Sequence, residues 1–186
     1  MSQTQLVAVV VAVIALATIV IFYLRTQRSK RLRERFGPEY NRAIETSGNA
    51  ARGEARLAQL ERRVEKFHIK PLEPAARERF VGSWRAMQGK FVDDPNHVVG
   101  EADQLVGDVL AARGYPVADF EQQAADLSVN HPLVIEHYRA GHEIAVRHRQ
   151  GKASTEDLRR ALIHYRKLFD ELVGEPERAQ TRAVGR

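Results

Sequence analysis

Five of the seven histidines lie between residues 131 and 164, and they are the side chains here best suited to chemistry. Neutral imidazole binds several transition metals, and it exchanges protons near neutral pH. Two of them, His137 and His142, share one predicted helix but lie about 140° apart around it, so they cannot bind one ion by themselves. A metal or ligand site assembled between helices from His137, His142 and His164 stays open as an alternative.

The simpler interpretation of these histidines is structural. Charged side chains occupy the opposite arc of their helix, which places the histidines toward its apolar side, where partly buried and hydrogen-bonded rings are expected; these charged residues are Glu136, Arg139, Glu143 and Arg147. The sequence contains no H-E-x-x-H motif and no repeated Glu-x-x-His pair of the kind that binds two metal ions in a bundle. We therefore predict no metal, no cofactor and no catalytic residue, and favour a non-enzymatic role.

Two further groups could be mistaken for sites. Asp93, Asp94 and His97 resemble metal ligands, but a helix that starts at Pro95 with Asp94 as its N-cap explains both acids. Three aromatic residues and a methionine share one face of a predicted helix, and they indicate core packing rather than a ligand groove; they are Phe80, Trp84, Met87 and Phe91. The absence of cysteine excludes disulfides, thiolate zinc sites and a cysteine nucleophile.

Residues 6–24, LVAVVVAVIALATIVIFYL, predict one transmembrane helix after a short N-terminal tail, residues 1–5. Nineteen residues at 1.5 Å each give about 28 Å, close to the ~30 Å thickness of the hydrocarbon layer. A cleaved signal peptide is the alternative, because Ala15-Leu16-Ala17 has the small-x-small pattern of a cleavage site. No basic residue precedes the apolar run, however, and more apolar residues follow that tripeptide, so we favour an anchor that is retained.

The excess of positive over negative charge in the chain lies in the segment that follows, residues 25–38. Its six bases are predicted to lie at the membrane surface near anionic headgroups; they are Arg25, Arg28, Lys30, Arg31, Arg33 and Arg35. Without them and Glu34, the remaining chain has 23 basic and 23 acidic residues, which offers no basic track for nucleic acid. The positive-inside rule then places the N-terminus outside and residues 25–186 in the cytoplasm. Specific lipid or nucleic-acid binding is the less favoured alternative for this segment.

Every periodic stretch beyond the span follows the helical period, so the fold class is all-α, with a small antiparallel helical bundle. We expect a long polar helix over residues 39–69, weakened or broken around Thr46–Asn49 and at Gly53. The bundle covers residues 70–173, and residues 174–186 form a disordered tail. Its last helix carries an apolar stripe that either packs internally, which we favour, or binds a partner; the stripe is Leu158, Ala161, Leu162, Tyr165, Leu168, Phe169 and Leu172.

Several motifs resemble a group of uncharacterised bacterial single-pass membrane proteins. The first is RLRERFGPEY at residues 31–40, directly after the span, and the others are FVDDP (91–95), RGYP (113–116), TEDLR (155–159) and HYR (164–166). The resemblance covers most of residues 31–172 and implies a bacterial inner membrane protein, but it brings no activity with it. We therefore expect a membrane-anchored cytoplasmic domain that serves as a protein-interaction or scaffold module. A small ligand-binding, metal-binding or enzymatic domain using interhelical His and Glu residues is the alternative.

Overall fold

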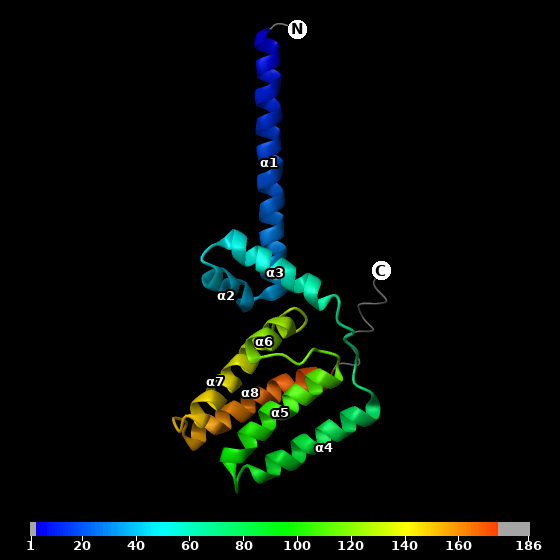
Figure 1. The fold of residues 1–186 in the computed structure, drawn as a ribbon, viewed down its shortest axis with the longest axis vertical. Coiled ribbons are helices and arrows are strands. Elements are labelled where there is room, and N and C mark those ends of the chain that lie inside the picture. The colour runs from blue at the N-terminus through cyan, green and yellow to red at the C-terminus, as the bar shows by residue number, and fades with distance from the viewer. Residues whose placement is uncertain (1–2, 175–186) are drawn as a thin grey trace. The chain divides into compact units, whose positions relative to one another are not determined.

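The computed structural model describes residues 3–174, and within that range the chain forms eight helices and no strand (Figure 1). The all-α prediction is therefore confirmed. The first helix already begins at Gln3, inside the predicted tail 1–5. The predicted disordered tail lies outside the described residues except for Gly174. The chain divides into two compact units, Met1–Ala58 and Gln59–Arg186, and each is described by itself.

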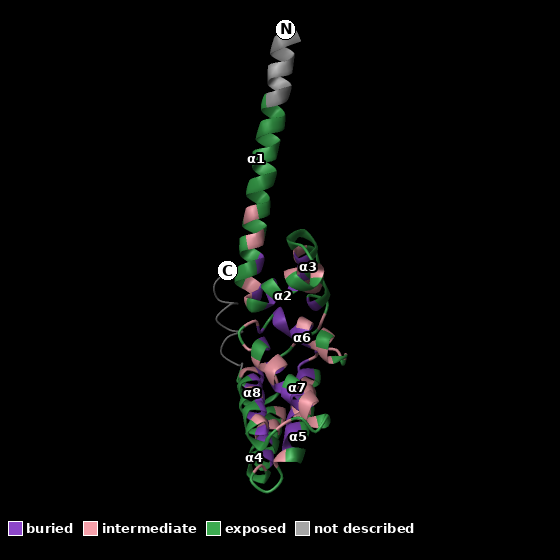
Figure 2. Ribbon diagram, turned by 90° about the vertical axis from the view of Figure 1, so that its left-hand side faces the viewer, coloured by how far each residue is buried: buried purple, intermediate pink, exposed green. Residues whose placement is uncertain are grey.

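The first unit begins with helix α1, Gln3–Phe36, which runs without interruption through the apolar segment and the basic segment. Each large apolar side chain from Val13 to Leu24 is 47–71% exposed, and Figure 2 shows this stretch as exposed. A helix of the hydrophobic core would bury these side chains. Among the described residues α1 is the one helix long and apolar enough to cross a membrane.

The polar segment predicted as one helix over residues 39–69, weakened or broken in its first half, forms two helices that end at Val64. They are α2, Pro38–Ser47, and α3, Ala50–Val64. Gly37 and Gly48 separate the three helices with φ angles of 51° and 75°, which glycine adopts without steric strain. The break expected around Thr46–Asn49 is thus confirmed.

The other glycine expected to weaken this region, Gly53, lies inside α3 and has a different role. A Cβ atom added there would be 2.9 Å from the Cα of Ile44 on α2. Two heavy atoms that are not bonded cannot approach so closely without a backbone shift. Gly53 therefore permits close contact between α2 and α3 rather than breaking α3.

The end of α1 folds with α2 and the start of α3 into a small cap with its own core. The buried apolar side chains are Leu32, Phe36, Tyr40, Ala43 and Leu57. One oxygen of Glu54 accepts hydrogen bonds from the Ser29 hydroxyl at 2.6 Å and from the Tyr40 hydroxyl at 2.8 Å, so α3 is tied to both other helices. Residues 29–57, which include most of the basic segment, are thus a folded element rather than a simple linker.

The second unit contains the helical bundle. Its helices are α4 (Pro74–Lys90), α5 (Pro95–Ala112), α6 (Phe120–Ser128), α7 (Ile135–Arg149) and α8 (Thr155–Val173). Short turns join α4 to α5 and α7 to α8, and each pair packs side by side in Figure 1, so both pairs are antiparallel. Helix α8 also packs on α5, which places the α5–α7–α8 contact at the centre of the bundle.

The last helix packs inward, as its apolar stripe predicts. All seven side chains of the stripe are buried, together with Val173. Across from them, Trp84 and Met87 of α4 are buried, and the flanking Phe80 and Phe91 are half-buried against the same core. The internal-packing prediction for α8 and the core prediction for the α4 aromatic stripe are both confirmed.

The helix starts in the bundle follow from local sequence. Pro74 and Pro95 are the first residues of α4 and α5, and the Asp94 side chain accepts a hydrogen bond from the His97 backbone N–H. Helix α7 begins only at Ile135, because residues 132–134 form a turn.

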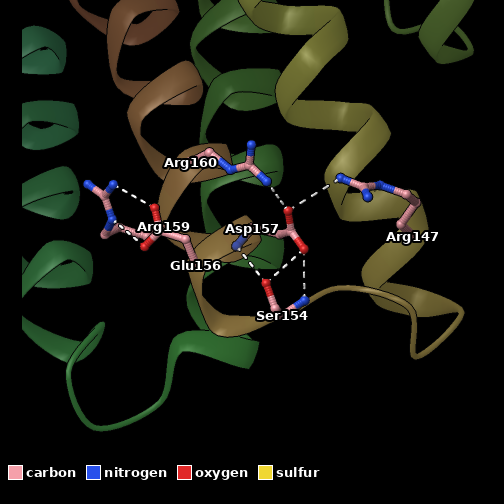
Figure 3. Close-up of polar contacts among 6 residues, drawn as sticks. All are labelled: Arg147, Ser154, Glu156, Asp157, Arg159 and Arg160. Atoms are coloured by element: carbon pink, nitrogen blue, oxygen red, sulfur yellow. Dashed lines mark hydrogen bonds and ion pairs between the residues drawn. The ribbon is translucent and has the colours of Figure 1, made fainter.

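Helix α8 begins with a reciprocal capping box, shown in Figure 3. The Ser154 hydroxyl accepts from the Asp157 N–H at 3.2 Å, and the Asp157 carboxylate accepts from the Ser154 N–H at 3.0 Å. Arg160 pairs with the same carboxylate, and Arg147 of α7 lies 3.7 Å from it. Hydrogen bonds from Ser154 and from Arg160 lower the pKa of Asp157 to about 2. The start of α8 is thereby joined to the end of α7.

Candidate functional site

The basic segment of α1 presents most of its charge to solvent. Five of the six predicted membrane-surface cations are exposed, and Arg35 is half-buried; the exposed ones are Arg25, Arg28, Lys30, Arg31 and Arg33. Arg33 also places its guanidinium 5.1 Å from the centre of the Tyr40 ring in the cap. The cations extend around the helix just beyond the exposed apolar stretch, where an anionic surface would meet them.

Two of the three histidines of the predicted alternative site come together. The Nδ1 atoms of His137 on α7 and His164 on α8 lie 3.0 Å apart, with their ring centroids 5.2 Å apart. One ring must donate its Nδ1–H and the other must accept it. Burial lowers the pKa of both rings, and the nearby charge of Lys167 lowers each further. The pair is therefore neutral and hydrogen-bonded at pH 7.

The third histidine, His142, does not join this pair. Its ring stacks on Phe120 with the centroids 3.6 Å apart, and its Nδ1 faces Asp103 of α5 at 3.6 Å. Among the described residues, no group of three His, Cys, Asp or Glu side chains could hold a metal ion. The alternative site of three histidines is therefore not formed, because the two histidines of α7 project in different directions.

Asp103 is the centre of a polar cluster in the middle of the bundle. The Tyr165 hydroxyl of α8 donates to its carboxylate at 2.8 Å, and His142 of α7 lies on the other side. Burial raises the pKa of Asp103, but His142 and Tyr165 together lower it below its ordinary value. Burial and the Asp103 charge raise the pKa of Tyr165. An ionised carboxylate thus connects three helices, an arrangement that no local sequence spacing indicates.

Three other histidines of the bundle also contact polar groups of the bundle itself. His148 contacts the backbone oxygen of Asn96 at 3.1 Å, and His97 pairs with Glu101 of its own helix at 3.1 Å. His131 is buried, with its Nδ1 3.6 Å from a carboxylate oxygen of Glu171. Partly buried, hydrogen-bonded histidines are what the sequence predicts for this region. Asp94, the middle member of the predicted Asp93–His97 cluster, is occupied as a helix cap.

A groove of about 140 Å³ lies on the outer side of the seam between α4 and α8. Its lining residues are Arg77, Val81, Trp84, Arg85, Arg166, Phe169, Asp170, Val173 and Gly174. Two of these residues, Trp84 and Phe169, stack on each other with ring centroids 4.6 Å apart. The indole N–H is buried and has no acceptor among the described residues. The sequence favours core packing of the aromatic stripe over a ligand groove, and Trp84 is the member of that stripe that is buried and also lines this groove.

The rim of this groove is positively charged. Arg77 donates to the backbone oxygen of Val173 at 3.0 Å, and Arg166 pairs with Asp170 at 2.8 Å. Arg85 is exposed and makes no hydrogen bond or ion pair with the described residues. With three arginines and one aspartate, the groove carries a net charge of about +2, which favours a ligand that combines a carboxylate with an apolar group.

Two features of the described chain present surface that its own packing leaves accessible. One is the exposed apolar stretch of α1 followed by its basic segment, and the other is the arginine-rimmed groove between α4 and α8. No protein-family model, no curated protein and no solved structure matches this chain.

Proposed function

We propose that this is a bacterial inner membrane protein with one spanning helix, its N-terminus outside and its bundle in the cytoplasm. The exposed apolar stretch of α1 carries this proposal, since such a surface is unfavourable in water and favourable in lipid. The exposed basic segment after it supports the orientation, because positively charged flanks resist translocation. The resemblance of RLRERFGPEY and the later motifs to bacterial single-pass proteins supports the location.

Fractionation and a reporter fusion test this part of the proposal. The full chain should stay with membranes after a high-salt or carbonate wash, because α1 holds it by apolar contact rather than by charge. A reporter fused after Arg186 should behave as cytoplasmic, and replacing all six basic residues of the segment with glutamine should weaken that orientation. Release by the wash would contradict the anchor, and periplasmic reporter activity would contradict the orientation.

We further propose that the bundle is a protein-interaction module whose docking surface is the groove between α4 and α8. The groove supports this role because its rim carries a net charge of about +2 and includes Arg85, which is exposed and makes no ion pair with the described residues. Interface anchors in proteins are enriched in tryptophan and arginine. An acidic segment of a partner, with a carboxylate next to an apolar side chain, is complementary to this surface.

Charge reversal on α4 tests the docking surface. After crosslinking in native membranes, the wild-type chain should copurify with a defined partner, and Arg85→Glu should lose that partner. Arg79→Glu is the matched control, because Arg79 is exposed on the same helix but does not line the groove. Equal recovery with both variants would show that the partner binds elsewhere.

One observation favours the alternative class, a metal-binding domain. It is the approach of two imidazole nitrogens on neighbouring helices, His137 and His164. The chemistry of that pair is independent of the anchor and of the groove.

A further inference from the structure

We propose that His137 and His164 form a two-histidine site for a divalent late transition metal ion, copper, nickel or zinc, between α7 and α8. Imidazole nitrogen is a favourable ligand for each of these ions. The bond between an imidazole nitrogen and zinc is about 2.0–2.1 Å long. Two such bonds at a right angle hold the nitrogens about 2.9 Å apart, and a tetrahedral angle holds them about 3.3 Å apart. The observed Nδ1–Nδ1 distance of 3.0 Å lies between these values.

Metal binding changes which nitrogen of one ring carries the hydrogen atom. In the metal-free pair one ring carries its hydrogen on Nδ1 and donates it to the Nδ1 lone pair of the other ring. When both Nδ1 atoms bind a metal, the donating ring moves its hydrogen to Nε2, and each neutral imidazole keeps one N–H. No proton is released from a neutral pair. Metal bonds then replace a single hydrogen bond between the two helices.

The residues around the histidine pair determine how tightly the metal ion is bound and which ligands complete its coordination. Glu136 contributes a negative charge near His137, whereas Lys167 lies near both rings and Arg160 near His164. Because the described residues hold no third His, Cys, Asp or Glu ligand for this position, water completes the coordination. A two-ligand site with two cationic neighbours binds moderately, and it favours copper, which forms the strongest complexes of the divalent series. Lys167 is the residue through which the affinity can be altered.

Metal binding at this position joins the last two helices of the bundle. His137 lies in the first turn of α7 and His164 near the middle of α8, and the two helices pack along each other. An ion that binds both rings in the folded state and not in the unfolded chain stabilises the fold by mass action. The bundle should therefore become more resistant to unfolding as the metal concentration rises above the dissociation constant.

The test is titration of the full chain, purified in detergent, with copper(II), nickel(II) and zinc chloride. The expected result is one copper ion per chain, with an electron paramagnetic resonance spectrum that shows coupling to two nitrogen atoms. His137→Ala and His164→Ala should each weaken copper binding by at least about tenfold, and Lys167→Gln should strengthen it several-fold. His97→Ala is the control, because His97 is exposed on α5 and pairs with Glu101 rather than with either ring.

The spectrum of the wild-type chain makes the test independent of how well the variants fold. One-nitrogen coupling, or a loss of affinity with His97→Ala equal to that with His137→Ala, would overturn the proposal. Copper binding unchanged in both His137→Ala and His164→Ala would overturn it as well. Circular dichroism of each variant, recorded before titration, shows whether its helices are intact.

Discussion

Removal of one hydroxyl group, in Tyr165→Phe, tests whether the central polar cluster stabilises the bundle. That hydroxyl donates at 2.8 Å to Asp103, whose pKa is lowered, so the acceptor is charged at neutral pH. Without the hydroxyl, the carboxylate keeps only His142 at 3.6 Å within the cluster. Hydrogen bonds to charged groups contribute about 1.5–3 kcal/mol, and we expect Tyr165→Phe to lower the free energy of unfolding by that amount.

Urea unfolding of the full chain in detergent measures this loss through tryptophan fluorescence. Trp84 is the only tryptophan and is buried in the bundle, so its emission reports on the bundle and not on α1. Tyr138→Phe is the matched control, because its hydroxyl donates at 2.7 Å to the neutral side chain of Gln123. That variant should lose only about 0.5–1.5 kcal/mol.

A double-mutant cycle with Asp103→Asn isolates the interaction. The two substitutions share one contact, so their effects should not add, and the coupling should account for most of the Tyr165→Phe loss. The carboxylate has a lower pKa in the folded state than in the unfolded state. Its contribution is therefore present above the unfolded pKa of about 3.8 and disappears as the pH falls through the folded value. Equal losses for Tyr165→Phe and Tyr138→Phe, or additive effects in the cycle, would refute the reasoning.

Three further substitutions test other parts of the structure. Leu162→Ala should destabilise the bundle by about 2–5 kcal/mol in the same urea assay, because the side chain is buried in the α8 stripe; an unchanged midpoint would contradict internal packing. Asp157→Asn should destabilise at neutral pH, and its difference from wild type should shrink as the pH falls from about 4 through the folded pKa of about 2, in thermal melts recorded against pH. Gly53→Ala should loosen the cap, since its Cβ would be 2.9 Å from the Ile44 Cα, and limited proteolysis should then cut near Gly48 faster than in Gly82→Ala, where the added Cβ meets open space.

Local signals were enough to predict most helices of the bundle. Pro74, the Asp94-Pro95 pair and Ser154 each determine a helix start through backbone or capping geometry, and the structure places the starts at those residues. The apolar stripe of α8 was predicted equally well, because a helical period on one element needs no knowledge of its neighbours. The cap was not predicted, because its core draws a few apolar residues from each of three helices and forms no strong stripe on any one of them.

Contacts between helices could not be predicted from the sequence, because they depend on how the helices are aligned with one another. His137 and His164 are 27 residues apart, and their contact depends on the register between α7 and α8, which no residue type encodes. The same holds for the groove, because Arg77 and Arg166 meet only when α4 and α8 lie side by side. The alternative of three converging histidines failed at His142, which faces Asp103 instead. The helical period shows on which side of α7 a residue lies, but it does not show which neighbouring helix contacts that side.

The uninterrupted course of α1 fixes how far the cap stands from the bilayer in the orientation proposed above. From Leu24, the last apolar residue of the span, to Leu32, the first core residue of the cap, α1 advances eight residues, or about 12 Å. The headgroup layer on one side occupies only about 5–8 Å. In that orientation the core of the cap begins just beyond the headgroup layer, at the end of a continuous helix. Any change in the tilt of the span, whether from bilayer thickness or from a neighbouring helix, moves the cap sideways without unfolding it.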